Sequence, residues 1–160
     1  MSNEYKDWLN DLTDTQRKNL ELCNKYPILI PTNSEDYDYE YTWLDEIEDG
    51  WRFAFGEEWA KEIQEFVNQL PEDEKDEVEI RCLKEKFGVF RQYFTKYPEG
   101  ISNIIDKYEK ISRETCIKCG KPATKISLGW ISPWCDDCAN NKGERYLTMT
   151  EYYKEMQDNV

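Results

Sequence analysis

Residues 116–138 read CIKCGKPATKISLGWISPWCDDC, in which two Cys-x-x-Cys pairs, Cys116/Cys119 and Cys135/Cys138, enclose a 15-residue spacer. This is the spacing of a four-cysteine zinc site, where four thiolates surround a tetrahedral cation. A gap of two residues lets the backbone turn and aim both sulfurs of a pair inward. Gly120 supplies the backbone freedom that such a turn often needs. The stretch therefore predicts a zinc ribbon that holds one Zn²⁺.

The spacer itself alternates apolar residues with small or charged ones. Ile126, Leu128 and Trp130 are the apolar members, and the alternation predicts a short hairpin between the two pairs. Four thiolates leave no coordination position for water, so a structural metal is expected, with no catalytic role. An iron–sulfur cluster is disfavoured, because the spacing matches neither common ferredoxin pattern. A redox-active site is also disfavoured, because a redox Cys-x-x-Cys pair needs no second pair.

The chain around this stretch predicts an α+β fold, with helices packed on a small antiparallel hairpin and a C-terminal zinc ribbon. Apolar periodicity indicates helices over 57–70 and 99–115, and a hairpin over 78–94 with Gly88 near its turn. Further helices are expected over 4–26, with a capping box at Thr13 and Gln16, and over about 150–158, capped by Thr148 or Thr150. The expected divisions are an acidic domain over 1–112, the ribbon over 113–140 and a polar helix or tail over 141–160.

These periodicities also give expectations about burial. Residues 28–30, between two prolines, should form a short buried extended segment. Cys23 and Cys82 should be small buried hydrophobes, and the ribbon should dock on the helix 99–115. The large residues expected in the core are Trp59, Phe66, Ile80, Ile104 and Tyr108.

The 160-residue chain has no histidine and a net charge of -13. The absence of histidine removes Ser-His-Asp and Cys-His catalysis and metal sites with imidazole ligands. Mg²⁺ held by carboxylates would be the remaining route to an enzyme, but no ordered constellation of acids and lysine stands out. No catalytic residue is therefore expected.

The acids are concentrated in one part of the chain. Residues 35–79 carry 18 acids and three bases, whereas residues 80–160 carry 14 bases and 11 acids. Binding to nucleic acid depends largely on neutralising phosphates, so the acidic part should repel DNA and RNA. Part of this asymmetry has an ordinary explanation in solubility.

An alternation of acids and tyrosines lies at the start of the acidic part. The stretch 34–41, SEDYDYEY, predicts either a strand that buries its rings or a surface that binds a partner. We favour the partner surface, because rigid amphipathic tyrosines suit an interface. Its expected members are Asp36, Tyr37, Asp38, Tyr39, Glu40 and Tyr41.

A smaller basic group falls in the predicted hairpin. Lys84, Lys86 and Arg91 either form an ordinary solvated face or a patch that binds an anion.

The N-terminus, MSNEYKDWLNDL, has no cationic start followed by an apolar run, and no apolar stretch approaches 18 residues. We therefore expect a cytoplasmic protein without membrane association. Thiols stay reduced in that compartment, which favours metal binding by the paired cysteines.

An ordered set of motifs spans about residues 43–139. It consists of Asp49-Gly50-Trp51, Lys84-Glu-Lys-Phe-Gly88-x-x-Arg91-x-Tyr93, Glu109-x-x-Ser112-x-x-Thr115-Cys116-x-x-Cys119-Gly120-x-Pro122, Gly129-Trp130-Ile131 and Cys135-Asp136-x-Cys138. The set resembles a family of small uncharacterised proteins encoded by phages and prophages. The resemblance implies a phage origin and a setting in the bacterial host cytoplasm, and it carries no established activity.

Two functions from different classes follow as hypotheses. The first is a non-enzymatic, zinc-binding phage protein that binds and inhibits a host protein, such as a bacterial defence effector or a nucleic-acid-binding protein. The alternative is a nucleic-acid-binding accessory protein that uses the zinc ribbon and nearby bases. Those bases are Lys84, Lys86, Arg91, Lys118, Lys121 and Lys125.

Overall fold

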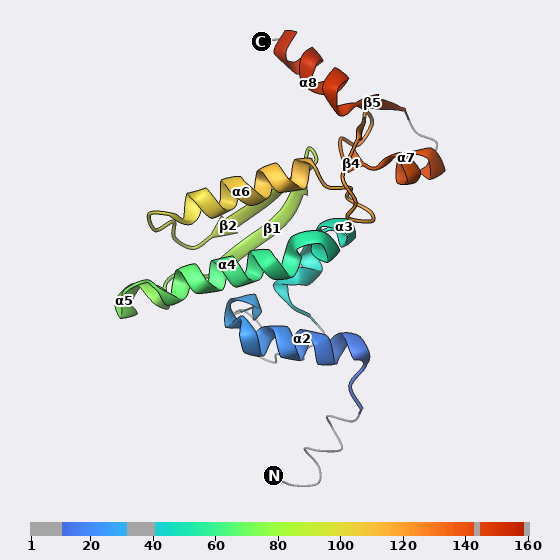
Figure 1. Ribbon diagram of the computed structural model, residues 1–160. Coiled ribbons are helices and arrows are strands. Elements are labelled where there is room, and N and C mark those ends of the chain that lie inside the picture. Colours follow the sequence, from blue (N-terminus) through green and yellow to red (C-terminus); the bar gives the residue numbers. More distant parts are fainter. Residues whose placement is uncertain (1–10, 32–40, 143–144, 159–160) are drawn as a thin grey trace.

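An antiparallel hairpin forms the centre of the α+β fold (Figure 1). The computed structural model describes residues 11–31, 41–142 and 145–158. Strands β1 (Ile80–Lys86) and β2 (Val89–Phe94) make the hairpin, and helices α4 (Glu57–Asn68) and α6 (Ile101–Arg113) pack against it. The predicted hairpin over 78–94 and the predicted helices over 57–70 and 99–115 are confirmed. No helix in the described part of the chain is long and apolar enough to cross a membrane.

Helix α2 (Asp14–Lys25) begins with the expected capping box. The backbone N–H of Gln16 donates to the Thr13 hydroxyl, and the Gln16 side chain accepts from the Thr13 N–H. The extended segment expected after it is wrong, because Pro27–Leu29 form the 3₁₀ helix η1. Proline fits the first helical position, where its missing N–H is not needed. Of the three residues 28–30, only Leu29 is fully buried.

A long helical run follows the short 3₁₀ helix η2 (Trp43–Glu46). It consists of α3 (Asp49–Trp51), a π-helical turn η3 (Arg52–Gly56), α4, and after a break the single turn α5 (Glu72–Lys75). Buried residues recur at every fourth position, namely Trp51, Phe55, Trp59, Ile63 and Val67. Four residues exceed one α-helical turn of 3.6 residues, so a purely α-helical run would rotate them away from the core. The wider π turn corrects this drift.

Phe90 of β2 lies at the centre of an aromatic core. Its ring centroid lies 6.2 Å from that of Trp51, 5.9 Å from that of Phe55 and 5.3 Å from that of Trp59. Of the residues expected in the core, Trp59, Ile80 and Tyr108 are buried. Phe66 and Ile104 are only half-buried, because they lie at the margin of their helices' apolar faces.

The register of the hairpin shifts between Ile80 and Cys82. A bulge of this kind changes which side chains point to a given face. Leu83 is therefore buried with Ile80, whereas Cys82 stands opposite Tyr93 on the outer face and is half-buried. The expected burial of Cys82 is wrong for this reason, and that of Cys23 on α2 is confirmed.

The four-cysteine region forms a second, three-stranded sheet at one end of the molecule (Figure 1). Its strand order is β4 (Pro133–Trp134), β3 (Lys125–Ser127), β5 (Tyr146–Thr148), all antiparallel neighbours. The β3–β4 pairing is the hairpin predicted between the cysteine pairs. Helix α7 (Asp136–Lys142) connects β4 towards β5, and α8 (Met149–Asp158) follows β5. Thr148 caps α8, since its hydroxyl accepts from the Glu151 N–H.

A buried hydrogen bond across the core gives a test of this packing. The Trp59 indole N–H donates to the Gln92 side-chain oxygen over 2.7 Å. Trp59→Phe leaves that oxygen buried without its donor, so the free energy of unfolding should fall by about 1–3 kcal/mol. Trp130→Phe is the matched control, because its exposed bond to Glu85 should be worth less than about 0.5 kcal/mol. Urea denaturation measures both, and equal losses would contradict the assignment of Gln92 to the core.

Candidate metal centre

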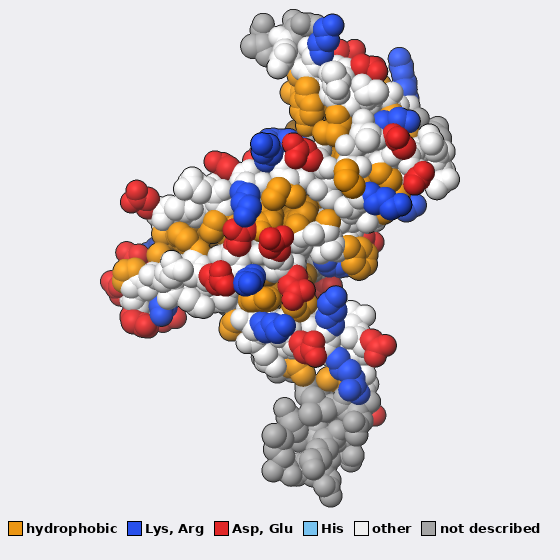
Figure 2. All heavy atoms as spheres, in the orientation of Figure 1, with side chains coloured by type: hydrophobic (Ala, Val, Ile, Leu, Met, Phe, Trp, Pro, Cys, Tyr) orange, Lys and Arg blue, Asp and Glu red, His pale blue; other side chains and the backbone are white. Residues whose placement is uncertain are grey.

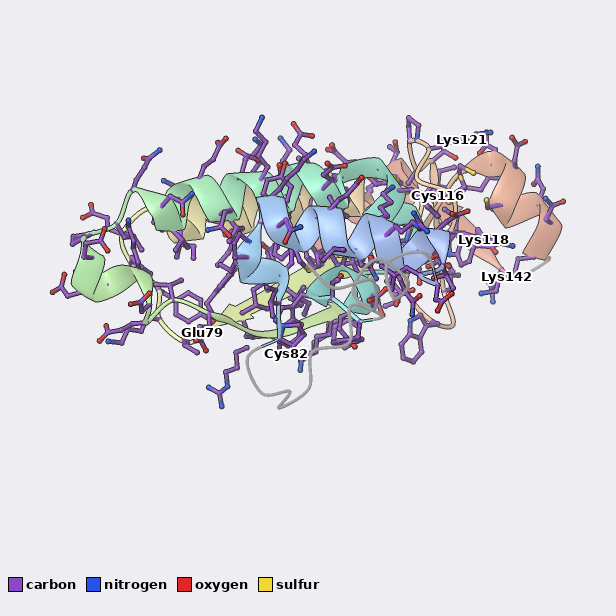
Figure 3. The ribbon with its side chains drawn as sticks, turned by 90° about the horizontal axis from the view of Figure 1, so that it is seen from below. Glu79, Cys82, Cys116, Lys118, Lys121 and Lys142 are labelled. Atoms are coloured by element: carbon purple, nitrogen blue, oxygen red, sulfur yellow. The ribbon has the colours of Figure 1, made fainter. Side chains whose placement is uncertain are left out.

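The thiols of Cys116, Cys119, Cys135 and Cys138 converge at the ribbon, with all four sulfur atoms within 4.8 Å of one another. Within the described residues this is the one group of three or more potential metal ligands with that geometry. Cys116 and Cys135 are buried, Cys138 is half-buried and Cys119 is exposed. Cys82 lies on β1, well away from this cluster (Figure 3).

The first cysteine pair begins three residues after Arg113, the last residue of α6. Gly120 has a φ of +84°, a left-handed conformation that glycine adopts without strain. This geometry lets the Gly120 N–H donate to the Cys116 carbonyl over 3.0 Å, while the Cys116 N–H donates to the Lys121 carbonyl over 2.7 Å. The turn predicted from Gly120 is therefore present, and it closes the loop beneath both sulfurs.

The second pair bridges a strand and a helix. Cys135 follows β4 directly, and Cys138 lies in the first turn of α7. The Cys138 N–H points at the Cys135 sulfur over 3.4 Å, and the Ala139 N–H donates to the Cys135 carbonyl over 3.0 Å.

Backbone hydrogen bonds hold the two pairs together. The Ile117 N–H donates to the Pro133 carbonyl over 2.9 Å, and the Thr124 N–H donates to the Trp134 carbonyl over 2.8 Å. The Cys119 and Cys135 sulfurs consequently lie 3.5 Å apart. Four sulfurs at about 2.3 Å from a tetrahedral cation would stand about 3.8 Å from one another, so the cluster has the dimensions of such a site.

Ionisation of the thiols points to a cation. Burial opposes ionisation of Cys116, but N–H donors of Cys119, Cys135 and Lys118 outweigh it and lower the pKa of this thiol to about 7. Burial and hydrogen bonds with neighbouring thiols raise the pKa of Cys138, and burial likewise raises that of Cys119. The thiols of Cys119 and Cys138 thus resist ionisation beside Cys116. A bound divalent cation would reverse that preference, because it deprotonates the thiols that coordinate it.

The cysteine loop packs directly on the start of the long helical run. The Gly50 N–H donates to the Ile117 carbonyl over 2.9 Å, and the Trp51 indole N–H donates to the Thr115 carbonyl over 3.0 Å. A Cβ atom on Gly50 would lie 2.2 Å from the Cys116 carbonyl oxygen, and one on Gly120 would lie 2.7 Å from the Gly50 oxygen. The two backbones can approach this closely only because both positions are glycine. We expected docking on α6, whereas the closest contact of the loop is with α3.

The contact at Gly50 was not foreseen. The resemblance led us to expect a helix start and a packed turn over Trp43 to Trp51, but not a contact between Gly50 and the cysteine loop. The sequence contains one indication of this contact, namely Gly50 itself. A glycine inside a helix weakens the helix, so its presence there usually has a packing reason.

The three bases proposed as an anion patch share the outer face of the hairpin. Lys84 pairs across the strands with Arg91, and Lys86 lies two residues further along β1. Each already has a neighbour in the protein. The Lys84 ammonium lies 5.2 Å from the Tyr93 ring, the Lys86 ammonium lies 5.9 Å from the Phe87 ring, and Arg91 pairs with Glu109.

Most of the predicted partner surface lies outside the described residues, namely Asp36, Tyr37, Asp38, Tyr39 and Glu40. Tyr41 is described, and its side chain is 39% exposed. Its hydroxyl donates to the Glu46 carboxylate. Partial burial and this bond raise the pKa of Tyr41, so the phenol stays neutral.

Three further lysines surround the cysteine cluster. Lys118, Lys121 and Lys142 lie at the ribbon end of the molecule with Cys116 (Figure 3). Lys121 lies 3.7 Å from the Asp137 carboxylate, and the Lys142 ammonium lies 4.4 Å from the Trp134 ring.

No protein-family model, curated protein or solved structure matches the chain.

The glycine contact yields a prediction with an internal control. Gly50→Ala forces the α3 backbone away from the cysteine loop, so the free energy of unfolding should fall by about 3 kcal/mol and bound metal should be lost more readily. Gly129→Ala should change stability by less than about 0.5 kcal/mol, since no atom lies within 4 Å of its Cβ position. Denaturation curves and metal analysis after gel filtration test both. Similar stabilities for the two variants would mean that the close approach is dispensable.

Proposed function

We propose that the chain is a non-enzymatic phage protein that binds a host protein, with a bacterial defence effector as the favoured partner, and inhibits it by covering its surface. The observation that carries this proposal is a carboxylate-rich surface on α4, α5 and the two residues that follow α5, which we call the acidic ridge. Its exposed members are Glu57, Glu58, Glu65, Glu72, Asp73, Glu74, Asp76 and Glu77. Figure 2 shows carboxylates gathered at the α5 end of the molecule.

Few bases neutralise this ridge. Glu72 pairs with Lys75 and Glu77 pairs with Lys96, whereas the other six members form no ion pair within the described residues. Residues 41–79 contain 14 acids and only three bases. Unpaired surface charge of one sign attracts a partner of opposite sign, speeds association and opposes binding of other acids. A basic groove on a host protein, of the kind that binds nucleic acid, fits this surface.

The stretch 34–41 adds four carboxylates and three tyrosines next to η2 in the sequence. Tyrosine rings supply contact area at low entropic cost, and carboxylates supply the charge complementarity. We propose Asp36, Tyr37, Asp38, Tyr39, Glu40 and Tyr41 as the part of the interface that gives specificity. The ridge would then contribute the long-range attraction.

We propose Zn²⁺ as the metal of the cysteine cluster. Four thiolates in tetrahedral arrangement suit zinc and fill its coordination positions, so the ion would serve the fold and supply no chemistry. Because the cysteine loop packs on α3, zinc would also hold the ribbon against the helical run that carries the acidic ridge. An inhibitor that acts only by covering its partner's surface needs its own binding surface to be held rigidly in this way.

One observation favours nucleic-acid binding as a second candidate. Lys84, Lys86 and Arg91 lie on the outer face of the hairpin, whereas α4 with its acids packs against Phe90 and Gln92 on the other face. This separation would reduce the repulsion between the acidic ridge and a polyanion. A gel shift at low salt distinguishes the candidates, because tight binding of plain DNA or RNA would favour the second.

The metal assignment predicts one zinc per chain. Cys135→Ser should abolish zinc binding and unfold the ribbon, because structural zinc contributes on the order of 10 kcal/mol. Cys82→Ser, far from the cluster, should leave the zinc content unchanged. Elemental analysis of the purified protein measures both. Absence of zinc, or iron accompanied by visible colour, would refute the assignment.

The interface assignment predicts that neutral variants lose the partner. Asp36→Asn, Asp38→Asn and Glu40→Gln combined should leave the protein folded with zinc bound, yet remove its host partner from a pull-down read by mass spectrometry. The wild-type complex should weaken as salt is added, because salt screens exposed charges.

A matched variant tests whether the partner needs the stretch 34–41 itself or only a negative charge on the protein. Glu72→Gln, Asp73→Asn and Glu74→Gln on α5 remove the same charge from the ridge, and should slow association without abolishing the complex. If the first variant still binds the partner, the stretch 34–41 serves the fold only and is not part of the interface.

A further inference from the structure

An apolar groove with two arginines lies at the tip of the hairpin, where the main body meets the ribbon and α8. We call it the tip groove; it has a volume of about 380 Å³. Phe87 and Val89 line it from the hairpin, Ile126 and Ile131 from the ribbon, and Tyr153 and Met156 from α8. Figure 2 shows hydrophobic side chains on the side of α8 that faces the end of α6.

Large apolar side chains stand exposed around this groove. Phe87 is 66% exposed, Trp130 is 73% exposed and Met156 is 52% exposed. Trp130 precedes Ile131 in the chain, and its indole N–H donates to Glu85, which also accepts from the N–H of Gly88 next to Phe87. A cluster of exposed apolar side chains of this size is typical of an interaction surface.

Backbone conformation at Phe87 gives independent evidence. Phe87 has a φ of +54° and Gly88 a φ of +78°, as in the two-residue turns that favour Asn-Gly. Within the described residues Phe87 is the one non-glycine with a positive φ, a conformation that disfavours bulky side chains. Its ring is not buried, so packing within the chain does not compensate the strain. A strained and exposed aromatic ring is explained if the ring contacts a partner.

Charge determines which partner fits. Arg91 and Arg113 line the tip groove, and no acid does so among the described residues. Both guanidinium groups share a single carboxylate, that of Glu109, at 3.3 Å and 3.9 Å. Lys86 adds another positive charge beside Phe87. The two arginines therefore carry one positive charge more than the carboxylate of Glu109 neutralises.

We propose that the tip groove is a docking site for an acidic polypeptide segment in which a carboxylate lies beside an aliphatic or aromatic side chain. The carboxylate would bind Arg91 and Arg113, which present paired N–H donors suited to it. The apolar side chain would enter between Val89, Ile131 and Met156. This surface is separate from the acidic ridge, so the protein would engage partners of opposite charge on two faces.

A polypeptide explains the exposed rings better than a small molecule does. A small ligand is usually enclosed by its pocket and would leave Phe87 and Trp130 uncovered at the rim. A chain segment is long enough to fill the groove and to extend beyond it over exposed side chains such as Phe87.

A nucleic acid fits the groove less well. Strands are held by a series of cations that follow the phosphates, whereas this groove presents two arginines shared with Glu109. Aliphatic side chains such as Ile126 and Met156 suit aliphatic or aromatic residues, while bases stack on flat rings.

Selection from a displayed library of short random peptides against the full-length, zinc-loaded chain tests the proposal. Enriched peptides should carry Asp or Glu next to Leu, Ile, Phe or Trp. The affinity of a fluorescein-labelled synthetic copy of the enriched peptide is then measured by fluorescence anisotropy, with single-stranded oligothymidine as competitor. Enrichment of peptides without acids, no enrichment, or efficient competition by oligothymidine would each overturn the proposal.

Variants then place the peptide in the groove. Phe87→Asn should weaken binding about tenfold while raising the thermal stability, because Asn tolerates a positive φ. Met156→Glu, at an exposed position, should weaken binding by a similar factor through charge repulsion. Phe53→Asn is the control, since Phe53 is 74% exposed and lines a different cavity, between α2 and η3. Peptide binding that is unchanged in both Phe87→Asn and Met156→Glu would show that the groove is not the site.

Discussion

The contact between Gly50 and the Cys116–Gly120 loop is the constraint on which the arrangement of the molecule depends. Two backbones approach there more closely than any side chain would permit. One belongs to the first turn of the helical run that carries Trp51, Phe55 and Trp59 into the aromatic core. The other closes the first cysteine pair. A metal bound by the cysteines would therefore stabilise the core as well as the ribbon, because the loop cannot move without disturbing α3.

Elements that depend on local pattern could be predicted from the sequence. Helices α4 and α6, the β1–β2 hairpin, the caps at Thr13 and Thr148 and the β3–β4 hairpin each follow from periodicity or spacing over a few residues. The four cysteines could also be predicted to converge, because their spacing is specific to metal sites. These predictions needed no knowledge of which elements pack together.

Features that depend on packing between distant segments could not be predicted. The bulge near Cys82 places Leu83 in the core, and nothing in the alternation of β1 shows that a residue will be inserted there. The approach of Gly50 to Gly120 joins segments on either side of the hairpin in sequence. Phe87 belongs to the motif Lys84-Glu-Lys-Phe-Gly88 in the sequence, and only its backbone conformation distinguishes it from an ordinary turn residue.

The hairpin separates two surfaces of opposite character. Its inner face, with Phe90 and Gln92, packs on α4, whose far side carries the acids. Its outer face carries Lys84, Lys86 and Arg91, and its tip holds Phe87 beside α8. The bulge contributes to this separation, since without it the alternation of β1 would turn charged residues toward the core. A net charge of -13 therefore describes the molecule poorly, because a partner meets either a carboxylate surface or an apolar groove with arginines. Binding to one surface leaves the other accessible, so the two proposed interfaces can act on different partners at the same time.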